Sequence, residues 1–235
     1  MAVTKEKYKT YNNVFDNFTL RNIFKLSSQG HFDELESPLF IGKESNVFTA
    51  LKDDKRVIVK IYRLETCDFN RMYDYIKYDP RYLSLKRNKR RIIFGWTQRE
   101  YRNIMKAREA GVIVPTPYVC LQNIIVMEMI GSIKPSPRLK DLMPDDHKSI
   151  KKLFDDVISN MIKLHKAGLV HADLSAFNIL NRDSKPVFID FSQSTPFNSP
   201  RGMEFLERDA KNISNFFIKF GIKTTKEKII KKILA

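Results

Sequence analysis

The sequence of 235 residues predicts an α+β protein, with strands concentrated before residue 130 and helices after it. Two observations carry this prediction. The stretch SPLFIGKESNVFTALKDDKRVIVKIY has the composition of two strands, roughly 38–51 and 56–62, joined by the turn-like LKDDK. The stretch DDHKSIKKLFDDVISNMIKLHKAG repeats apolar residues at the i, i+3, i+4, i+7 spacing of a helix. We therefore expect a β-rich first lobe and an α-rich second lobe.

The first half of the chain divides into a short extension and a strand-rich segment. Residues 1–37 are mostly polar, and their apolar residues have helical spacing as far as Gly30. After the two strands, WTQREYRNIMKAREAG predicts a helix that begins at Trp96 and ends before Gly111. The turn-like VPTP follows, and IIVMEM predicts one more short strand.

The second half is predicted to consist of helices around a small hairpin. Its long helix ends at Gly168. Two short strands follow, one at Leu169–Val170 or Asn178–Leu180 and one at Val187–Phe191, and FLERDAKNISNFFIKF again has helical spacing. The expected units are a helical extension 1–37, a first lobe 38–130 with a basic insert 64–94, a second lobe 131–223 and a basic tail 224–235.

The composition indicates a globular protein with anionic partners. Hydrophobic residues make up 43% of the chain and charged residues 29%. No signal-like apolar core begins the chain, and the longest apolar run is too short to cross a bilayer, so no membrane association is expected. Cys67 and Cys120 have no disulfide or metal-ligand spacing, which favours a reducing, cytoplasmic location. The net charge of +15 favours nucleic acid, nucleotides or an anionic surface as partners, although lysines on every solvated face would give the same number.

The stretch LVHADLSAFNIL and the following VFIDF carry the polar residues of a catalytic site. Asp173, Leu174 and Asn178 have the D-L-x-x-x-N spacing of the protein-kinase catalytic loop. In phosphoryl transfer Asp173 would orient or deprotonate the attacking hydroxyl, while Asn178 and Asp190 would hold Mg²⁺, or Mn²⁺ in its place. Asp190 is the only charge in VFIDF, and such a carboxylate needs a partner. The alternatives are that Asp173 and Asn178 form a turn and that Asp190 caps a helix.

Lys60 is the expected phosphate-neutralising residue. In VIVKIY, Val57, Val59 and Ile61 point to one face of the strand, whereas Lys60 lies on the other, where it needs an anion. Its expected partner is Glu100 rather than Glu109, because Gly111 places Glu109 in the last turn of the helix. The alternative is that Lys60 extends out of an edge strand into solvent. His171 is expected to pack structurally.

With these motifs the chain resembles the RIO-type atypical protein kinases. The residues responsible are HADLSAFNIL, IDFSQS in place of D-F-G, and GKESNVF as a glycine-poor phosphate loop, and the similarity runs from about Val14 to Gly221. The 37 residues before the first strand are too few for a winged helix, and the insert Leu64 to Phe94 matches the first RIO branch, which lacks that domain. The forty-five residues after Asp190 contain no A-P-E segment, so the expected C-lobe is truncated.

The resemblance implies a two-lobed protein-kinase-like fold that binds ATP in the cleft. It implies that Met127 is the gatekeeper residue and that the backbone of Glu128 and Ile130 contacts the adenine. It also implies that Asp190 accepts the phosphoryl group in an ATPase cycle and that the protein acts in maturation of the small ribosomal subunit. The expected ATP-binding residues are Gly42, Lys43, Ser45, Val47, Lys60, Met127, Glu128 and Ile130, and the expected catalytic residues are Lys60, Glu100, Asp173 and Asp190.

The basic insert is the expected contact with ribosomal RNA. Tyr82 and Phe94 would stack on bases, and Ser84 is the residue at which the resemblance places autophosphorylation. The alternative is a solvated loop without a partner. Six cations fall within residues 81–91, namely Arg81, Lys86, Arg87, Lys89, Arg90 and Arg91.

Two other functions remain compatible with the sequence. One is a non-catalytic RNA-binding scaffold that holds nucleotide as a switch in ribosome assembly, which the basic insert favours. The other is a small-molecule phosphotransferase of the aminoglycoside-kinase type, which shares the H-x-D-x-x-x-x-N pattern from His171 to Asn178.

Overall fold

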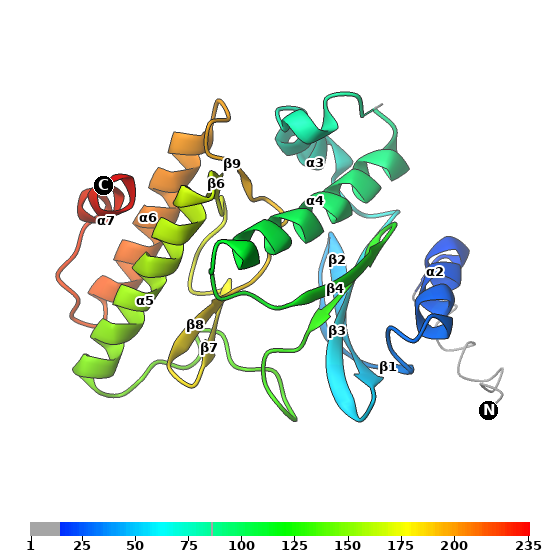
Figure 1. Ribbon diagram of the computed structural model, residues 1–235, viewed down its shortest axis with the longest axis horizontal. Coiled ribbons are helices and arrows are strands. Elements are labelled where there is room, and N and C mark those ends of the chain that lie inside the picture. Colours follow the sequence, from blue (N-terminus) through cyan, green and yellow to red (C-terminus); the bar gives the residue numbers. More distant parts are fainter. Residues whose placement is uncertain (1–14, 86) are drawn as a thin grey trace.

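A five-stranded antiparallel sheet forms the first lobe in the computed structural model, which describes residues 15–85 and 87–235 (Figure 1). The first fourteen residues of the expected extension and Lys86 of the basic insert lie outside the described residues. The strand order is β1-β2-β3-β5-β4, and each neighbouring pair is antiparallel. The strands are β1 (Glu34–Ile41), β2 (Ser45–Lys52), β3 (Lys55–Tyr62), β4 (Pro117–Leu121) and β5 (Ile124–Glu128).

The prediction of a single strand over 38–51 was wrong, because the chain turns back between β1 and β2. The Gly42 N–H donates to the Ser45 carbonyl at 3.0 Å and closes the turn. A Cβ on Gly42 would lie 2.7 Å from the Phe40 ring and 2.9 Å from the Ser45 carbonyl oxygen, so only glycine fits there. β1 begins at Glu34, within the segment expected to be helical, and β4 was not predicted.

Helix α2 (Asn17–Ser28) covers one face of this sheet, and Asp16 caps it by accepting from the N–H of Phe18 and Thr19. Its buried residues share a core with alternate residues of β3 and β5. Val57, Val59 and Ile61 of β3 belong to this core, which confirms their predicted common face. Lys60 therefore lies on the opposite face, toward the second lobe.

The insert after β3 is folded rather than a loop. It contains helix α3 (Phe69–Ile76) and a 3₁₀ turn, η1 (Pro80–Tyr82), and its end forms the first two turns of α4 (Lys89–Glu109). The predicted start of α4 at Trp96 was therefore seven residues too late. Asn88 caps the helix by accepting from the Arg91 N–H at 3.3 Å, and Ile92 and Ile93 are completely buried, which holds these turns in place.

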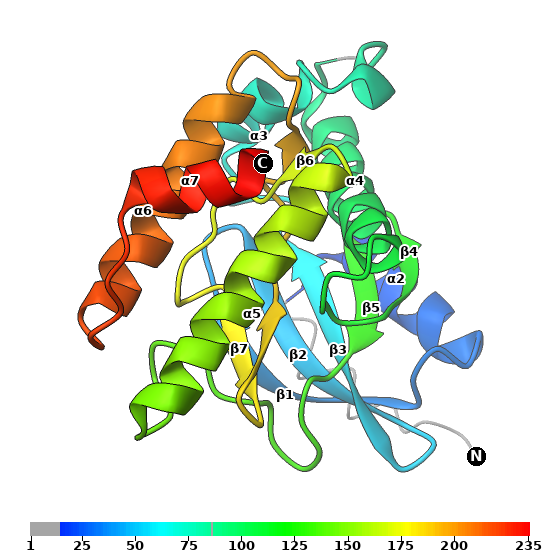
Figure 2. The ribbon, with the colours of Figure 1, turned by 60° about the vertical axis from the view of Figure 1, so that its left-hand side comes forward.

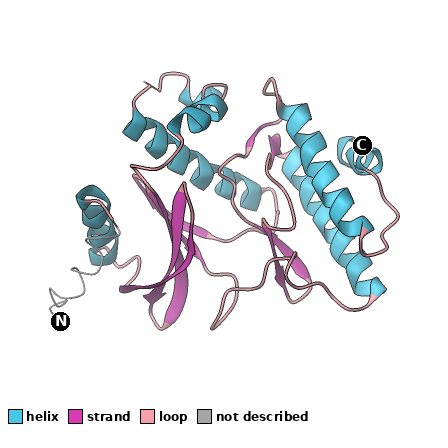
Figure 3. Cartoon of the chain, turned by 180° about the vertical axis from the view of Figure 1, so that it is seen from behind, coloured by secondary structure: helices cyan, strands magenta, loops and turns pink. Residues whose placement is uncertain are grey.

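The second lobe is mainly helical, which confirms the predicted α+β fold class with a β-rich and an α-rich half (Figure 2). Phe154 of α5 (His147–Lys166) and Phe217 of α6 (Gly202–Ile218) contact each other with ring centroids 5.1 Å apart, so these two helices pack together. Two small β-pairs, β6 with β9 and β7 with β8, lie between these helices and the first lobe (Figure 3). The elements are α5 (His147–Lys166), β6 (Leu169–Val170), β7 (Ile179–Arg182), β8 (Lys185–Phe188), β9 (Thr195–Pro196), α6 (Gly202–Ile218) and α7 (Lys226–Leu234).

The segment expected to be a basic tail forms helix α7. Its Ile229 and Ile233 are buried in the main core beside α5 and α6, while its lysines lie on the other side. The amphipathic spacing of KEKIIKKIL explains both the burial and the charge. None of the helices in the described residues has the length and apolar character needed to cross a membrane.

Candidate active site

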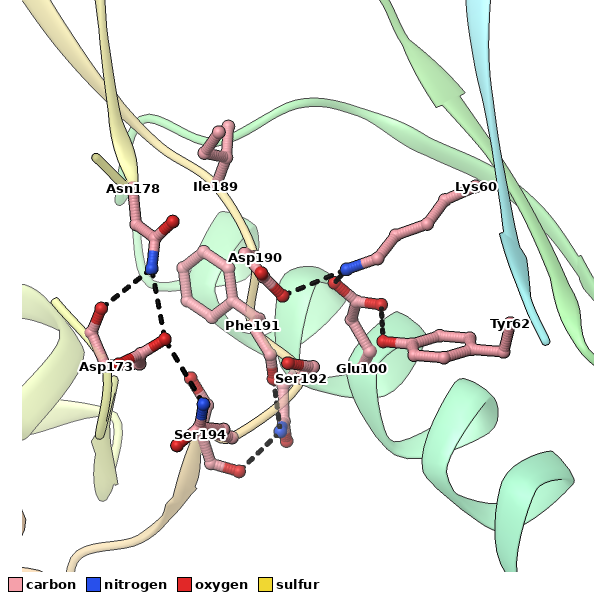
Figure 4. Close-up of polar contacts among 12 residues, drawn as sticks. Lys60, Tyr62, Glu100, Asp173, Asn178, Ile189, Asp190, Phe191, Ser192 and Ser194 are labelled. Carbon is pink, nitrogen blue, oxygen red and sulfur yellow. Dashed lines mark hydrogen bonds and ion pairs between the residues drawn. The ribbon is translucent and has the colours of Figure 1, made fainter. Parts of the chain in front are cut away.

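Lys60 of β3 joins the two lobes through a pair of carboxylates (Figure 4). Its Nζ lies 2.7 Å from Oε1 of Glu100 on α4 and 2.9 Å from Oδ1 of Asp190, which follows β8. The ion pair expected between Lys60 and Glu100 is therefore present. Tyr62 also points to this face and donates its hydroxyl to Glu100 Oε2 at 2.6 Å.

The charges around Lys60 keep it protonated. Burial alone would lower the pKa of Lys60, but the negative charges of Asp190 and Glu100 outweigh burial and hold the pKa above its ordinary value. Burial and the Glu100 carboxylate raise the pKa of Tyr62 well above 10, so its hydroxyl remains a donor. The arrangement presents a fixed ammonium group to the cleft, as contact with phosphate oxygens requires.

Asp190 is an ionised carboxylate at the floor of the cleft. Burial acts to raise its pKa, but the charge and hydrogen bond of Lys60, with a further hydrogen bond from Ser192, lower the pKa to about 2. Its side chain is 40% exposed, so the carboxylate remains open to a ligand. Its backbone φ is 62°, in the left-handed region that non-glycine residues rarely adopt, and such strain is typical of functional sites.

Asp173 and Asn178 face each other across the catalytic loop. The Asn178 Nδ2 donates to the backbone oxygen of Asp173 at 2.8 Å and to its Oδ2 at 3.3 Å. Figure 4 shows the Asn178 amide nitrogen on the Asp173 side and its oxygen on the other side, which leaves that oxygen available to a metal ion. Burial, together with the charge of Asp190, raises the pKa of Asp173, which makes it a better proton acceptor than an exposed aspartate.

These oxygens suit a magnesium ion. Asn178 and Asp190 supply one amide oxygen and one carboxylate, and Mg²⁺ in phosphotransfer sites takes one or two protein carboxylates and completes its shell with water and phosphate oxygens. Within the described ranges no cluster of three or more His, Cys, Asp or Glu is placed to hold a metal. The ligand set therefore fits an ion that is bound together with a phosphate, and it does not form a closed protein cage.

His171 has a structural environment. Its Nε2 lies 3.0 Å from the Ile189 carbonyl, which can only accept, so this nitrogen carries the proton. The ring contacts Phe188 and Phe191, and Nδ1 has no hydrogen-bond partner in the described part of the chain. Burial lowers the pKa of His171 to about 4, so the imidazole is neutral in the folded protein.

Lowering the pH from about 7 to about 5 should reduce the free energy of unfolding of the wild type by about 2 kcal/mol more than that of His171→Gln. The pKa of an unfolded histidine is near 6.5, whereas burial lowers the pKa of folded His171 to about 4, so the free energy of unfolding falls as the pH drops between these values. Urea unfolding at both pH values measures the difference. The exposed His147→Gln is the control, and equal pH dependence of wild type and His171→Gln would contradict the assignment.

Asp209 of α6, which was not predicted, fixes the backbone of the catalytic loop. Its Oδ2 and Oδ1 accept from the N–H of Ala172 and of Leu174, each at 2.8 Å, and Arg208 donates to the Ala172 carbonyl. Ala172 has φ of 65°, so these bonds hold a strained residue beside Asp173. A sequence signal existed, because Asp209 lies four residues from both Phe205 and Ile213 on the buried face of a helix.

A buried polar network, also not predicted, connects the insert to the segment after Asp190. The completely buried Arg99 donates to Asp79 at 3.1 Å and to the Ser192 carbonyl at 2.9 Å. Asn103 donates to the Ser194 carbonyl at 2.8 Å and accepts from Arg81 at 2.9 Å. The backbone on the far side of Asp190 is therefore anchored to α4 and η1.

The cleft between the lobes has a volume of about 440 Å³ and a mostly apolar inner part. Val47 and Ile58 line it from the sheet, and Leu180 and Ile189 line it from the second lobe, as the two sides of an adenine pocket would require. Of the expected ATP-binding residues the lining includes Ser45, Val47, Lys60, Met127, Glu128 and Ile130, and it does not include Gly42 or Lys43, which lie at the β1–β2 turn.

The end of β5 and the residues that follow it leave the backbone N–H of Ile130 open to a base. The Glu128 N–H donates to the Thr116 carbonyl at 2.8 Å, and the Ile130 carbonyl accepts from the Ser136 N–H at 2.7 Å. Among the described residues no backbone bond outside the strands occupies the Ile130 N–H. Glu128 turns its carboxylate away to Thr116, whose hydroxyl donates to it at 2.7 Å.

The structure changes the expectation for the basic insert. Tyr82 is buried and Phe94 stacks on Phe18 with ring centroids 5.5 Å apart, so neither aromatic is placed to stack on a base, contrary to prediction.

The cations of the insert are partly engaged by protein groups. Arg81 forms an ion pair with Asp79 at 2.6 Å, so one of the cations expected to contact phosphate already has a partner. Ser84 is exposed. Arg87, Lys89 and Arg90 also contact protein groups, namely Asn70, the Glu65 carbonyl and the Phe18 ring.

The chain is similar over most of its length to known kinases. A family model described as the RIO domain matches residues 46–230. The chain is 38% identical over 217 residues to the RIO-type serine/threonine-protein kinase Rio1 of Haloferax volcanii, covering 92% of this chain and 74% of the relative. It is 42% identical over 214 residues to Rio1 of Methanocaldococcus jannaschii, covering 90% and 72%.

Solved structures show the same architecture. A Rio2 kinase from Chaetomium thermophilum, described as an ADP/Mg²⁺-phosphoaspartate complex, matches with a TM-score of 0.66 at 20% identity. The match covers 90% of this chain and 64% of the Rio2 chain, so this chain spans slightly less than two thirds of that protein. At this identity the likeness establishes the protein-kinase-like fold.

Proposed function

The chain belongs to the RIO family of protein kinases, in its Rio1-type branch, and from this premise we propose that it acts in the cytoplasm as an ATP- and Mg²⁺-dependent serine/threonine kinase or ATPase. Mn²⁺ would serve in place of Mg²⁺, since both prefer oxygen ligands. The observation that carries the proposal is the position of Lys60 Nζ, 2.7 Å from Glu100 and 2.9 Å from Asp190, where the two lobes meet over the cleft.

In the proposed complex the adenine lies between the apolar sides of the cleft, and the triphosphate extends toward Lys60. The backbone of Glu128 and Ile130 would bind the base, with Met127 at the inner end of the pocket. Ser45 lines the cleft, so its hydroxyl is available to a phosphate, whereas Gly42 and Lys43 would act only through the conformation of the β1–β2 turn. Lys60 would neutralise phosphate charge, and Glu100 would hold Lys60 in position.

Asp173 is the proposed proton acceptor of the kinase reaction. It would orient a serine or threonine hydroxyl and accept its proton as the oxygen attacks the γ-phosphorus. The bond between the γ-phosphorus and the bridging oxygen would break, and ADP would leave with the β-phosphate. Asn178 and Asp190 are the proposed ligands of the metal ion, which when bound neutralises the charge that develops on the phosphate oxygens. The raised pKa of Asp173 supports this assignment, because a stronger base accepts the proton more readily.

Asp190 is also the proposed acceptor in an ATPase cycle. One carboxylate oxygen would attack the γ-phosphorus and release ADP. A water molecule would then hydrolyse the aspartyl-phosphate, which releases inorganic phosphate and restores the carboxylate. The ionised state of Asp190 supports this role, because a carboxylate must be unprotonated to attack. The Rio2 structure described as a phosphoaspartate complex adds the support of a distant relative.

The expected result of incubating the protein with γ-labelled ATP and Mg²⁺ is label on the protein, with ADP formed. Acid-quenched samples are divided and one half is treated with hydroxylamine, which cleaves an acyl-phosphate and leaves phosphoserine intact. Hydroxylamine-labile label that is absent from Asp190→Asn supports the ATPase cycle, and stable label, mapped to Ser84 or elsewhere, supports the kinase activity. ATP that remains intact in single-turnover conditions would overturn both and favour a nucleotide-switched scaffold.

Maturation of the small ribosomal subunit is the proposed setting, with ribosomal RNA and the precursor particle as partners. The charge of +15 supports an RNA partner. Fewer residues of the insert are available for RNA contact than the sequence suggested, because Arg81 is paired with Asp79 and Tyr82 is buried. The exposed Arg91 remains available to phosphates, and the exposed Ser84 belongs to the same insert.

A further inference from the structure

Gln193 connects helix α3 of the insert to the catalytic loop. Its Nε2 donates to Asp173 Oδ2 at 3.2 Å, and its Oε1 accepts from the hydroxyl of Tyr75 at 2.8 Å. The sequence separations of 20 and 118 residues show that three distant segments meet at this amide. Two hydrogen bonds therefore link a tyrosine in the insert with the carboxylate proposed to accept the proton.

The orientation of the Gln193 amide follows from its two neighbours. A carboxylate only accepts, so the amide must present its nitrogen to Asp173 and its oxygen to Tyr75. The Asp173 carboxylate disfavours the flipped amide, which would place an oxygen against an oxygen, and the Tyr75 hydroxyl donates to Oε1 and holds the other end of the amide. Without the Tyr75 hydroxyl, the amide could rotate and the donor to Asp173 would no longer be fixed.

Tyr75 is itself held on two sides. Its ring stacks on Phe205 of α6, with centroids 5.4 Å apart and planes at 12°, and meets the edge of Trp96 of α4 at 5.9 Å. Met72 and Ile76 anchor α3, because at most 1% of either residue is exposed. The Tyr75 hydroxyl thus has a position set by α3, α4 and α6 together.

The carboxylate of Asp173 is restrained at one oxygen and open at the other. Gln193 and Asn178 both donate to Oδ2, at 3.2 and 3.3 Å. Among the described residues no donor occupies Oδ1. Two donors on one oxygen fix the rotation of the carboxylate and direct the other oxygen to an attacking hydroxyl, and small errors in such positioning cost rate.

We propose that Tyr75 and Gln193 are positioning residues for the phosphoryl-transfer step, and that Tyr75 acts on Asp173 only through Gln193. This inference rests on the proposed function, since it assigns a role toward the residue proposed as proton acceptor. It also makes α3 part of the catalytic apparatus, although the sequence placed that segment in an insert for RNA contact.

The test is a double-mutant cycle of Tyr75→Phe, Gln193→Ala and the pair. Tyr75→Phe keeps the stacked ring and removes only the hydroxyl, and the matched control is Tyr78→Phe, an exposed tyrosine three residues away outside the network. Turnover of ATP gives kcat and KM, and thermal unfolding checks the fold. The chain has one tryptophan, Trp96, so its fluorescence emission reports whether the aromatic ring at position 75 keeps its place in the Tyr75→Phe variant.

The expected result is a loss in kcat of about tenfold for Gln193→Ala and about three- to tenfold for Tyr75→Phe, with KM for ATP changed less than about twofold. Removal of the Tyr75 hydroxyl should have no further effect on kcat once the Gln193 side chain is absent, so the kcat of the double variant should equal that of Gln193→Ala. Tyr78→Phe should retain wild-type kcat, and the Trp96 emission should be unchanged in Tyr75→Phe.

Two results would overturn the inference while leaving the proposed function intact. In the first, the wild type turns over ATP, and the kcat of Tyr75→Phe is no lower than the kcat of the control Tyr78→Phe. The other is a Tyr75→Phe effect of the same size with and without Gln193, which would mean that the hydroxyl acts by another route. A wild type that binds ATP but shows no turnover would instead contradict the proposed function itself, so the two failures are distinguishable.

Discussion

Asp190→Asn is expected to reduce ATP turnover by at least about a thousandfold. The substitution keeps the shape of the side chain but replaces the carboxylate with a neutral amide, so the charge that would bind the metal ion and the nucleophile that would attack the γ-phosphorus are both lost. Lys60 keeps its 2.7 Å contact with Glu100, so the fold should persist. Turnover is measured by ADP release under saturating ATP and Mg²⁺, with thermal unfolding as the check on folding.

Asp145→Asn is the matched control for this experiment, because it makes the same chemical change at an exposed position outside the cleft. It should turn over ATP at the wild-type rate. Wild-type turnover in Asp190→Asn would show that the ionised carboxylate beside Lys60 takes no part in the reaction, and the proposed assignment of the cleft would then be wrong.

Lys60→Met is expected to lower the free energy of unfolding by about 3–5 kcal/mol and to abolish turnover. The variant leaves the Glu100 carboxylate buried, with a side chain only 1% exposed, and without its cationic partner. Among the residues that the structure describes, the Tyr62 hydroxyl would be the one side-chain donor left to it. Urea unfolding measures the stability, and Lys55→Met, an exposed lysine at the start of the same strand, is the control.

The double variant Lys60→Met, Glu100→Gln separates stability from catalysis. A neutral amide at position 100 can still accept the Tyr62 hydroxyl without an unpaired charge, so most of the lost stability should return. Turnover should remain absent, since no ammonium group faces the cleft. If the double variant is as unstable as Lys60→Met, the destabilisation has a cause other than the unpaired Glu100.

Lys60 and Asp190 could be predicted from the sequence because each is a charged residue surrounded by apolar neighbours in the chain. Lys60 is a charge in an apolar strand, and Asp190 is the only charge in the apolar stretch VFIDF, so each requires a partner of opposite charge. Glu100 was preferred to Glu109 because Gly111 places Glu109 in the last turn of the first long helix after Lys60. The fold class followed from the change in hydrophobic period along the chain, which depends on local spacing and is visible without tertiary information.

The residues that were missed depend on contacts between distant segments. Tyr75, Gln193 and Asp209 are ordinary polar residues in their own stretches, and only the folded chain brings them to the catalytic loop. Tyr82 was assigned to base stacking because a basic neighbourhood does not reveal which side chains turn inward. The β1–β2 turn was missed because a short strand-turn-strand around a single glycine resembles one long strand in composition.

The left-handed backbone at Ala172 limits which chains of this kind can function. A β-branched side chain there would clash with its own backbone, whereas glycine, asparagine or aspartate would adopt the conformation readily. The set of amino acids tolerated at position 172 is therefore determined by backbone geometry and not by the chemistry of any reacting group. Genomic surveys for working enzymes could discard candidates with valine or isoleucine immediately before the aspartate that corresponds to Asp173, the proposed proton acceptor, even when every other site residue is intact.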